Sequence, residues 1–271
     1  MLDGGPNADD RFVDYYARQS ESDKTRQRFE GTRRVALGLR SALGESTNNL
    51  QIVDIGCGAG TQTHLWAADG HRAHGIDISA PLIDLARERA AHMKLDATFE
   101  VCSANQLNIR DESVDVVLVS ELLEHLVEWE PCVNEALRIL RPGGVVYLST
   151  TNRLCPIQQE FTLPAYSWYP ASLKKHCERL AVTTRKHWVQ YASFPAVHWF
   201  SFYQLRDHLN ARGVTAKDRF DFIETGESSL RGALLAAIGA SRPLRFFAHV
   251  LTPYTLVVGH RRRDAGAALR T

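Results

Sequence analysis

The 271-residue chain lacks the features that mark several large classes of protein. Its five cysteines are scattered singly without Cys-x-x-Cys spacing, so neither a disulfide framework nor a thiolate zinc site is indicated. Its longest apolar runs, around residues 114–119 and 233–240, fall far short of the roughly 18 residues that span a bilayer. Its acidic first ten residues do not resemble a signal peptide. We therefore expect a cytoplasmic protein with reduced thiols and at most peripheral membrane contact.

The chain also lacks an excess of charge of either sign. Its formal net charge is +1, and nothing in that balance demands a nucleic-acid partner. No internal repeat or low-complexity segment interrupts it. With 44% hydrophobic residues, the chain is long enough to bury a sizeable core as one domain with an insertion.

Short β-rich runs alternate with segments of helical composition in the middle of the chain. Strands are predicted at residues 50–55, 72–77, 98–102, 114–120 and 145–150, with helices at 61–68, after Ser79 and at 131–140. A turn is predicted at residues 141–144, before the fifth strand. Strands that alternate with helices favour a parallel, doubly wound α/β sheet. Such sheets bind ligands beyond the carboxyl ends of their strands.

Three glycines stand at alternate positions directly after the first predicted strand. Gly56, Gly58 and Gly60 lack a Cβ atom, so the loop can turn tightly and let backbone amides approach a ligand at the start of the following helix. Asp77 ends the second strand, where a carboxylate can hold a ribose diol. The nicotinamide fingerprint has its third glycine one position later, where this chain has Thr61, so a dinucleotide is the weaker fit.

Four motifs follow one another in a specific order. They are DIGCGAG at residues 54–60, GIDIS at 75–79, SVDVV at 113–117 and LRPGG at 140–144. Over residues 50–150 the series resembles the class I S-adenosylmethionine-dependent methyltransferases. The resemblance implies a seven-stranded, mostly parallel Rossmann-like sheet with an antiparallel last strand, an N-terminal helical cap, and S-adenosylmethionine lying across the glycine loop.

The same resemblance implies a set of cofactor-binding residues. Asp77 would hold the ribose hydroxyls and Ile78 would flank the adenine. Many relatives carry an aspartate after the third strand, whereas this chain has Ser103 there, so the serine or its backbone would replace that contact. The full implied set is Asp54, Gly56, Cys57, Gly58, Gly60, Asp77, Ile78, Ser103, Ala104, Ser120 and Glu121.

Candidate catalytic residues follow the fourth strand. Glu121, Glu124 and His125 form a Glu-x-x-Glu-His pattern that resembles the ubiquinone-pathway O-methyltransferases and the small-RNA 2′-O-methyltransferases, where it is a metal site. Oxygen and imidazole ligands suit Mg²⁺ or another divalent metal, which would lower the pKa of a substrate hydroxyl. Two alternatives stay open. In the first, His125 acts as a base or positions the acceptor without a metal. In the second, His125 has only a structural role in packing.

A second histidine completes the candidate set. Both groups of relatives place a histidine just before the helix that follows the fifth strand. His198 precedes a helix predicted at residues 203–211, so it is the candidate fourth ligand or proton acceptor. The alternative is a histidine that makes hydrogen bonds in the core.

The connection between the fifth strand and this helix is unusually long and rich in aromatic residues. Eleven of the chain's 24 aromatic residues fall between residues 161 and 203. Basic residues outnumber acidic ones in the same segment. Long connections of this kind are commonly lids or binding loops, and this one favours an anionic acceptor. The alternative is an insertion that packs its own small core. Further on, residues 214–222 and 254–259 are predicted as the last pair of strands. Residues 230–251 between them are predicted as amphipathic helices that either cover the sheet or lie on a membrane.

These observations predict four segments: an N-terminal helical cap (1–49), an S-adenosylmethionine-binding core (50–151), an insertion or lid (152–200), and the C-terminal part of the sheet (201–271). The predicted function is methyl transfer from S-adenosylmethionine to a hydroxyl of a small-molecule or lipid-linked acceptor. An RNA methyltransferase and a donor-binding regulatory protein without turnover are the alternatives. The neutral charge and the absence of a separate RNA-binding domain argue against nucleic acid, and no motif predicts an oligomeric state.

Overall fold

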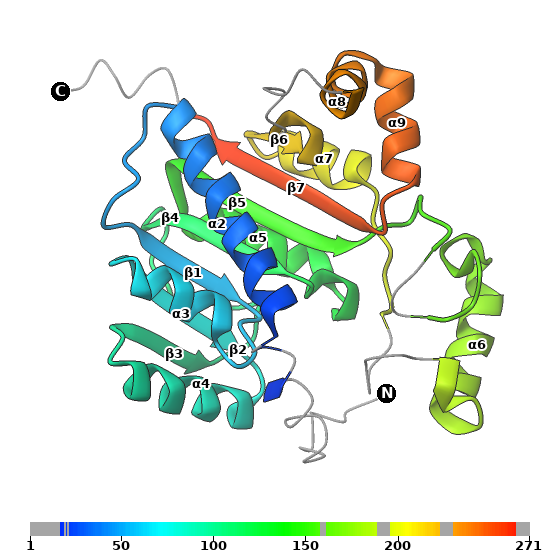
Figure 1. Ribbon diagram of the computed structural model, residues 1–271. Coiled ribbons are helices and arrows are strands. Elements are labelled where there is room, and N and C mark those ends of the chain that lie inside the picture. Colours follow the sequence, from blue (N-terminus) through cyan, green and yellow to red (C-terminus); the bar gives the residue numbers. More distant parts are fainter. Residues whose placement is uncertain are drawn as a thin grey trace. The chain divides into compact units, whose positions relative to one another are not determined.

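The computed structural model describes residues 17–18, 20, 22–157, 161–188, 196–222 and 230–263. Its strands form one seven-stranded sheet in the order β3-β2-β1-β4-β5-β7-β6 (Figure 1). The strands are β1 (Gln51–Ile55), β2 (Arg72–Asp77), β3 (Ala97–Val101), β4 (Val114–Ser120), β5 (Leu140–Thr151), β6 (Val214–Asp218) and β7 (Tyr254–Arg261). Strands β1 to β4 pair in parallel, and Figure 1 shows β7 running opposite to β5. The predicted fold class is therefore confirmed.

Helices connect these strands as the alternating sequence pattern predicts. They are α2 (Asp23–Ala42), α3 (Thr61–Ala68), α4 (Ala80–Met93), α5 (Trp129–Ile139), α6 (Ala171–Thr183), α7 (Phe202–Asn210), α8 (Leu230–Ala240) and α9 (Arg242–Val250). Short 3₁₀ turns occur at η1 (Leu123–His125), η2 (Tyr166–Trp168), η3 (Lys186–Trp188) and η4 (Arg219–Phe222). Among the described helices, none is both long enough and apolar enough to cross a membrane.

The chain divides into two compact units, which we describe separately. The first unit comprises residues 1–120, 128–147 and 260–271, and the second comprises residues 121–127 and 148–259. In the first unit, β4 is buried on both faces, as expected of a central parallel strand. Ile83, Ala86 and Ala90 on α4 form a buried cluster with Phe99 of β3. Pro81 lies in the first turn of α4, where its missing N–H costs nothing.

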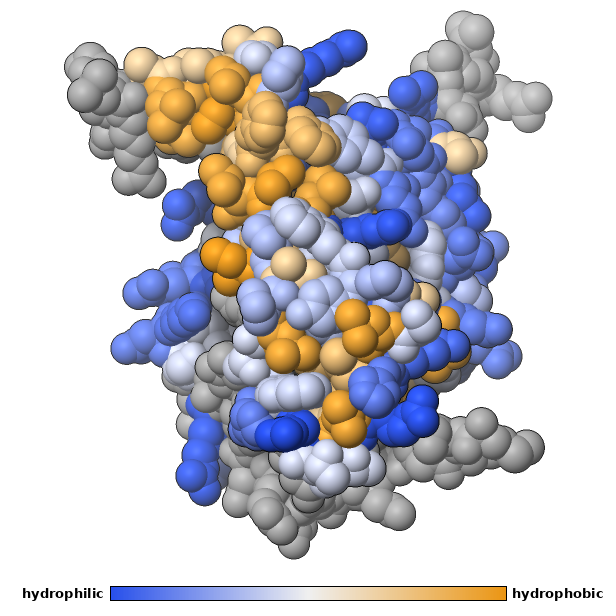
Figure 2. All heavy atoms as spheres, turned by 90° about the vertical axis from the view of Figure 1, so that its right-hand side faces the viewer, coloured by the Kyte–Doolittle hydropathy of each residue, from blue (hydrophilic) through white to orange (hydrophobic). Residues whose placement is uncertain are grey.

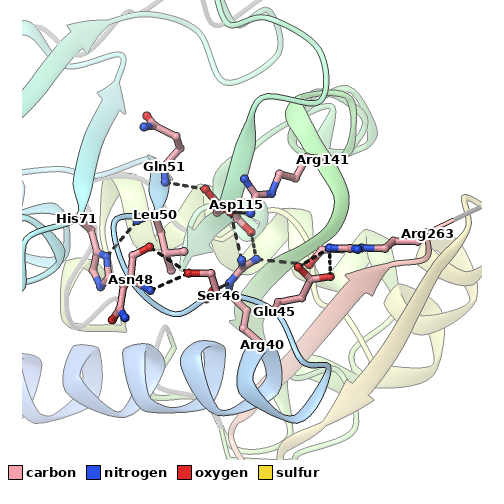
Figure 3. Close-up of polar contacts among 11 residues, drawn as sticks. Arg40, Glu45, Ser46, Asn48, Leu50, Gln51, His71, Asp115, Arg141 and Arg263 are labelled. Atoms are coloured by element: carbon pink, nitrogen blue, oxygen red, sulfur yellow. Dashed lines mark hydrogen bonds and ion pairs between the residues drawn. The ribbon is translucent and has the colours of Figure 1, made fainter. Parts of the chain in front are cut away.

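A buried arginine ties α2 to the start of β4. The Arg40 side chain is fully buried and donates hydrogen bonds to the carboxylate and the main-chain oxygen of Asp115, both at 3.2 Å (Figure 3). Asp115 also accepts the backbone N–H of Gln51 at 2.8 Å and pairs with Arg141. A buried charge is tolerated only when it is paired in this way. This network therefore anchors the N-terminal helix at the amino ends of β1 and β4.

Two element boundaries differ from the sequence prediction. The turn predicted at residues 141–144 is absorbed into β5, which already begins at Leu140. Gly143 adopts a φ of 81° within this strand, and its carbonyl oxygen accepts a hydrogen bond from Arg40 at 3.4 Å. The strand predicted at residues 214–222 instead ends at Asp218, because the Asp218 carboxylate accepts the backbone N–H of Phe220 and turns the chain into η4.

The second unit is held together by a buried ionic cluster. Asp218 is fully buried, and its carboxylate accepts hydrogen bonds from Arg245 Nε at 2.6 Å and from His249 Nε2 at 2.8 Å. Asn152 donates to the backbone oxygen of His249 at 2.8 Å, which links the end of β5 to α9. Burial alone would raise the pKa of Asp218, but the bonds from His249 and Arg245 lower it to about 2.

We expect Arg40→Met to lower the free energy of unfolding by about 3 kcal/mol, because it leaves the buried Asp115 carboxylate without its main partner. Urea denaturation followed by circular dichroism measures this loss. Arg26→Met is the matched control on the same helix, because the Arg26–Glu30 pair is solvent-exposed and contributes at most about 0.5 kcal/mol. A loss below about 1 kcal/mol for Arg40→Met would contradict a supporting role for the network.

The Asp218 cluster predicts a specific acid sensitivity. Because the folded-state pKa of about 2 lies below the ordinary value of 3.8, the ionised carboxylate stabilises the fold above about pH 4, and this stabilisation of about 2 kcal/mol is lost as the pH falls through 2. Asp218→Asn removes that pH dependence and lowers stability at neutral pH, where Arg245 loses its buried partner. Thermal unfolding between pH 2 and 7 tests this, with the exposed Asp84→Asn as control.

Candidate functional site

The glycine loop lies between β1 and α3 in the first unit. The backbone N–H groups of Gly56 and Cys57 donate to the carbonyl oxygen of Ile76 at 2.7 and 2.9 Å, so the loop is held against the end of β2. Gly58 and Gly60 have φ values of 53° and 78°, in the left-handed region that side chains disfavour. The loop conformation is therefore set by glycines and by the neighbouring strand.

Among the left-handed glycines of the loop, Gly58 and Gly60 serve different purposes. A Cβ atom on Gly60 would lie 2.8 Å from both the Ala86 Cβ and the Phe99 ring, so this glycine allows the loop to pack against α4 and β3. A Cβ on Gly58 would meet nothing within 4 Å. The space beside Gly58 is open, which leaves room for a ligand to approach the backbone at this point. Cys57 turns its thiol towards Gly75, and burial raises the pKa of that thiol.

Asp77 bridges the loop and the start of α4. One carboxylate oxygen accepts the N–H of Gly58 at 2.9 Å, and the other accepts the N–H of Ser79 at 2.9 Å. A carboxylate has about four lone-pair positions, so each oxygen keeps the capacity to accept a ligand hydroxyl. Ile78, the next residue, is 65% exposed and offers an apolar contact beside the carboxylate. The arrangement suits a ribose with an adjoining base.

The residues that follow β3 lie next to Asp77. The N–H of Cys102 donates to the carbonyl oxygen of Asp77 at 3.0 Å, so the following Ser103 and Ala104 begin next to Asp77. The Ser103 hydroxyl accepts the N–H of Asn105 at 3.3 Å, and the Ser103 side chain is exposed. The structure therefore brings Ser103 and Ala104 to the edge where the glycine loop ends.

Asp54 occupies a different environment from Asp77. It is 2% exposed and accepts hydrogen bonds from Gln62 at 3.2 Å and from the Thr63 hydroxyl at 2.9 Å, both on α3. Burial raises the pKa of Asp54 to about 7. Ser120, at the end of β4, donates to the Gln62 side chain at 3.4 Å. The sequence analysis missed Gln62 and Thr63. Their amide and hydroxyl groups, in the first turn of the helix after a glycine loop, could have indicated partners for Asp54.

The Glu121–His125 segment belongs to the second unit. Glu121 has a φ of 54°, an uncommon conformation for a residue with a side chain, and its N–H donates to Ser149 O at 2.8 Å. Glu124 is 2% exposed, and its carboxylate accepts the Thr150 hydroxyl at 2.7 Å. Strained backbone at a non-glycine residue is costly and concentrates at functional sites. The sequence analysis missed Thr150, although it lies near the end of β5, the strand next to β4.

His125 and His198 are brought into the same neighbourhood by the backbone. The carbonyl oxygen of Glu124 accepts the N–H of Val197 at 2.7 Å and that of His198 at 3.2 Å. The His198 ring lies at hydrogen-bond distance, 3.0 Å, from the carbonyl oxygen of Val127. The Nδ1 atom of His125 is buried and makes no hydrogen bond. Burial lowers the pKa of His125, and Glu121 opposes this shift in part, so the imidazole is neutral at pH 7.

The predicted metal set does not fit this geometry. Among the described residues, no group of three or more histidine, cysteine, aspartate or glutamate side chains is arranged to hold a metal ion. Of the four predicted ligands Glu121, Glu124, His125 and His198, the Glu124 carboxylate is buried against Thr150 and the His198 ring contacts a backbone carbonyl. The expectation of a divalent metal is therefore unsupported, and we assign no step to one.

The insertion packs a small core of its own. Its buried members are Phe161, Tyr166, Cys177, Ala181, Ala196 and Trp199. The Lys174 ammonium lies 4.5 Å from the centre of the Trp199 ring and donates to the Ser167 carbonyl at 2.8 Å. This supports the alternative in which many of the aromatic residues stabilise the insertion itself. Two of the eleven aromatic residues, at positions 191 and 194, lie outside the described residues.

Comparison with known proteins agrees with this site. A sequence model of the methyltransferase domain family matches residues 53–148, which include the glycine loop, Asp77 and the Glu121–His125 segment. Residues 53–148 are thus similar to the methyltransferase domain family, in agreement with the class I S-adenosylmethionine-dependent methyltransferases that the motifs resemble.

The methyltransferase domain is similar to enzymes of one named activity. It is 32% identical to a ubiquinone biosynthesis O-methyltransferase of Bartonella tribocorum over 106 residues, which are 39% of this chain and 43% of the relative. It is 36% identical to that of Cupriavidus pinatubonensis over 104 residues, 38% of this chain and 42% of the relative. The match thus spans less than half the length of these relatives.

A solved structure extends the likeness of fold beyond the methyltransferase domain. The YcgJ protein from Bacillus subtilis has a TM-score of 0.53 at 17% identity, covering 84% of this chain and 99% of that protein. At this identity the likeness concerns the fold alone.

Gly58 and Gly60 give a matched test of the loop. We expect Gly60→Ala to lower the free energy of unfolding by about 2–4 kcal/mol, since the new Cβ adds a clash with Ala86 and Phe99 to the backbone strain. Gly58→Ala adds only backbone strain, about 1–2 kcal/mol. Urea denaturation compares the two, and equal losses would contradict the different packing of the two glycines.

Proposed function

We propose that the protein transfers a methyl group from S-adenosylmethionine to a hydroxyl oxygen of a small-molecule or lipid-linked acceptor. The observation that carries the proposal is Asp77, whose carboxylate is fixed beside open space at Gly58 by two backbone N–H groups. Ribose hydroxyls bind to a carboxylate held in this position. The O-methyltransferase activity of the relatives in Bartonella tribocorum and Cupriavidus pinatubonensis, after which they are named, supports oxygen as the methylated atom.

In the proposed binding mode, the first unit holds the donor. Asp77 accepts the ribose hydroxyls, Ile78 flanks the base, and the backbone at Gly58 approaches the donor closely. Ser103 and Ala104 lie at the base end, because they follow the hydrogen bond between Cys102 and Asp77. Asp54 acts indirectly by holding Gln62 and Thr63, which fix the first turn of α3. Asp54 is thus a positioning residue in this proposal.

The chemical step needs a base for a hydroxyl acceptor. The donor supplies a methyl carbon that its sulfonium has already activated. As the acceptor oxygen forms its bond to this carbon, the carbon–sulfur bond breaks and the acceptor proton must leave. His125 suits this role, because its lowered pKa keeps the imidazole neutral at pH 7 and therefore able to accept a proton. S-adenosylhomocysteine, the methylated acceptor and protonated His125 are the products.

Donor binding is the first test. We expect titration calorimetry to detect S-adenosylmethionine and S-adenosylhomocysteine, and Asp77→Asn to weaken both by about 10-fold or more, because a charged hydrogen-bond acceptor is lost. The exposed Asp84→Asn is the matched control. No donor binding by the folded wild-type protein would overturn the proposal.

His125 is tested by separating turnover from donor binding. In a panel of phenolic and polyprenyl-phenolic acceptors, His125→Ala should reduce kcat by about 10²- to 10⁴-fold while the donor Kd stays unchanged. The exposed His92→Ala, at the end of α4, serves as control. Since burial lowers the pKa of His125, the rate should fall with acid only below the ordinary value of 6.5. Donor binding without product from any acceptor would instead support a regulatory protein.

A further inference from the structure

Helix α9 has its polar side turned inward. Arg245 and His249, four residues apart on one face, both bind the fully buried Asp218. Arg245 also pairs with Asp221 at 2.6 Å, and His249 stacks on Phe202 with ring centres 5.2 Å apart. A surface helix normally buries its apolar face and exposes its polar one. In α9, Arg245 and His249 hold the helix against Asp218, so its apolar side chains are left free to face outward.

The opposite face of α9 exposes large apolar side chains. Leu244, Phe247 and Leu251 follow the i, i+3, i+7 spacing of one helical stripe and are 43%, 61% and 80% exposed. Phe246, beside them, is 41% exposed. Single exposed apolar residues are common on protein surfaces. A continuous apolar stripe instead indicates a surface that binds a partner or a membrane.

Helix α8 extends this apolar surface. Residues 232–240 contain no charged side chain, and Leu234 is 59% exposed. Ala233, Ala236, Ala237 and Ala240 are exposed as well. Figure 2 shows apolar residues gathered at the top of the molecule, at the height where Figure 1 draws α8 and α9. The two helices follow each other with only Ser241 between them, so they present one surface.

The two helices themselves carry no acidic side chain, and one of their arginines, Arg245, is already paired with Asp218 and Asp221 beside α9. Residues 230–251 contain three arginines and no aspartate or glutamate, whereas the whole chain has 31 acidic and 32 basic residues. Arg242 is exposed at the first position of α9. Apolar side chains bordered by arginine are the pattern of helices that lie at a lipid interface, where the long basic side chains reach the headgroups.

We propose that α8 and α9 dock the protein onto an anionic lipid bilayer. The helices have 11 and 9 residues, too short to cross the bilayer, and they lie in its surface with Leu244, Phe247 and Leu251 among the upper acyl chains. Arg242 pairs with lipid phosphate. The exposed Arg242 and the lack of acidic residues within 230–251 favour an anionic lipid surface over a protein partner. The proposal is independent of methyl transfer, since vesicle binding requires no turnover.

Vesicle co-sedimentation with the full-length chain tests the proposal. We expect binding to vesicles of phosphatidylcholine with about one third phosphatidylglycerol, and weaker binding to phosphatidylcholine alone. Binding to the mixed vesicles should fall, without vanishing, when the salt concentration is raised. Absence of binding to both kinds of vesicle would overturn the proposal.

Single substitutions locate the surface. Phe247→Glu and Leu251→Glu should each reduce the partition coefficient by at least about 10-fold, because each replaces a buried apolar contact with a charge. Arg242→Glu should reduce binding only to the anionic vesicles. Met93→Glu, at the exposed end of α4, is the matched control and should bind as the wild type does.

Thermal unfolding by circular dichroism confirms that each variant is folded. Equal vesicle binding by the wild type and Phe247→Glu would overturn the proposal, because lipid would then bind elsewhere. A concentration-dependent dimer that Phe247→Glu abolishes, with no vesicle binding, would assign the surface to a second copy of the chain and also overturn it.

Discussion

The parallel register of the central strands is the constraint on which the candidate donor site depends. Ile55 of β1 pairs with Ile76 of β2 on one side and with Val119 of β4 on the other. Because these three residues lie side by side, the residues that follow them leave the sheet at the same edge. Gly56 and Asp77 meet there without any long-range loop movement. A slip of one residue in either pairing would separate the glycine loop from the carboxylate.

The amino ends of the same strands are fixed by charge. The Asp115 carboxylate accepts the N–H of Gln51, which lies directly before the paired stretch of β1 and β4. Arg40 then closes the network from α2. A buried ion pair is costly to form, but it is also intolerant of misplacement, because a displaced partner leaves an unpaired charge. The charge network and the glycine loop therefore fix opposite ends of the same strands.

Features of the fold that are encoded locally could be predicted from the sequence. The strands before Gly56 and Asp77, the helix after Ser79 and the order of the motifs follow from short-range patterns, and the structure confirms them. The start of β5 could not be predicted, since residues 141–144 carry a strong turn signal. The hydrogen bond from Arg40 to Gly143, residues far apart in the sequence, takes part in keeping that stretch in the sheet. Such a contact has no local signature.

The orientations of the side chains at the candidate site could not be predicted from short-range sequence patterns either. Resemblance predicted that the segment of His198 would lie near Glu124, and backbone hydrogen bonds place it there. The directions of the rings depend on which carbonyl or hydroxyl each side chain meets. Val127 and Thr150 supply those partners, and neither belongs to a recognisable motif. The predicted metal set therefore lacks support at the level of side chains among the described residues.

Hydrogen bonds to Ile76 and Asp77 shape the glycine loop within the fold. Ile76 accepts two of them and Asp77 accepts another, so the loop loses its conformational entropy on folding rather than on ligand binding. In the proposed reaction, the donor and the spent product share the adenosyl portion that this rigid loop would hold. A rigid loop cannot distinguish them, and it would retain both with similar strength. In the proposed reaction, S-adenosylhomocysteine would therefore compete with the donor for the loop.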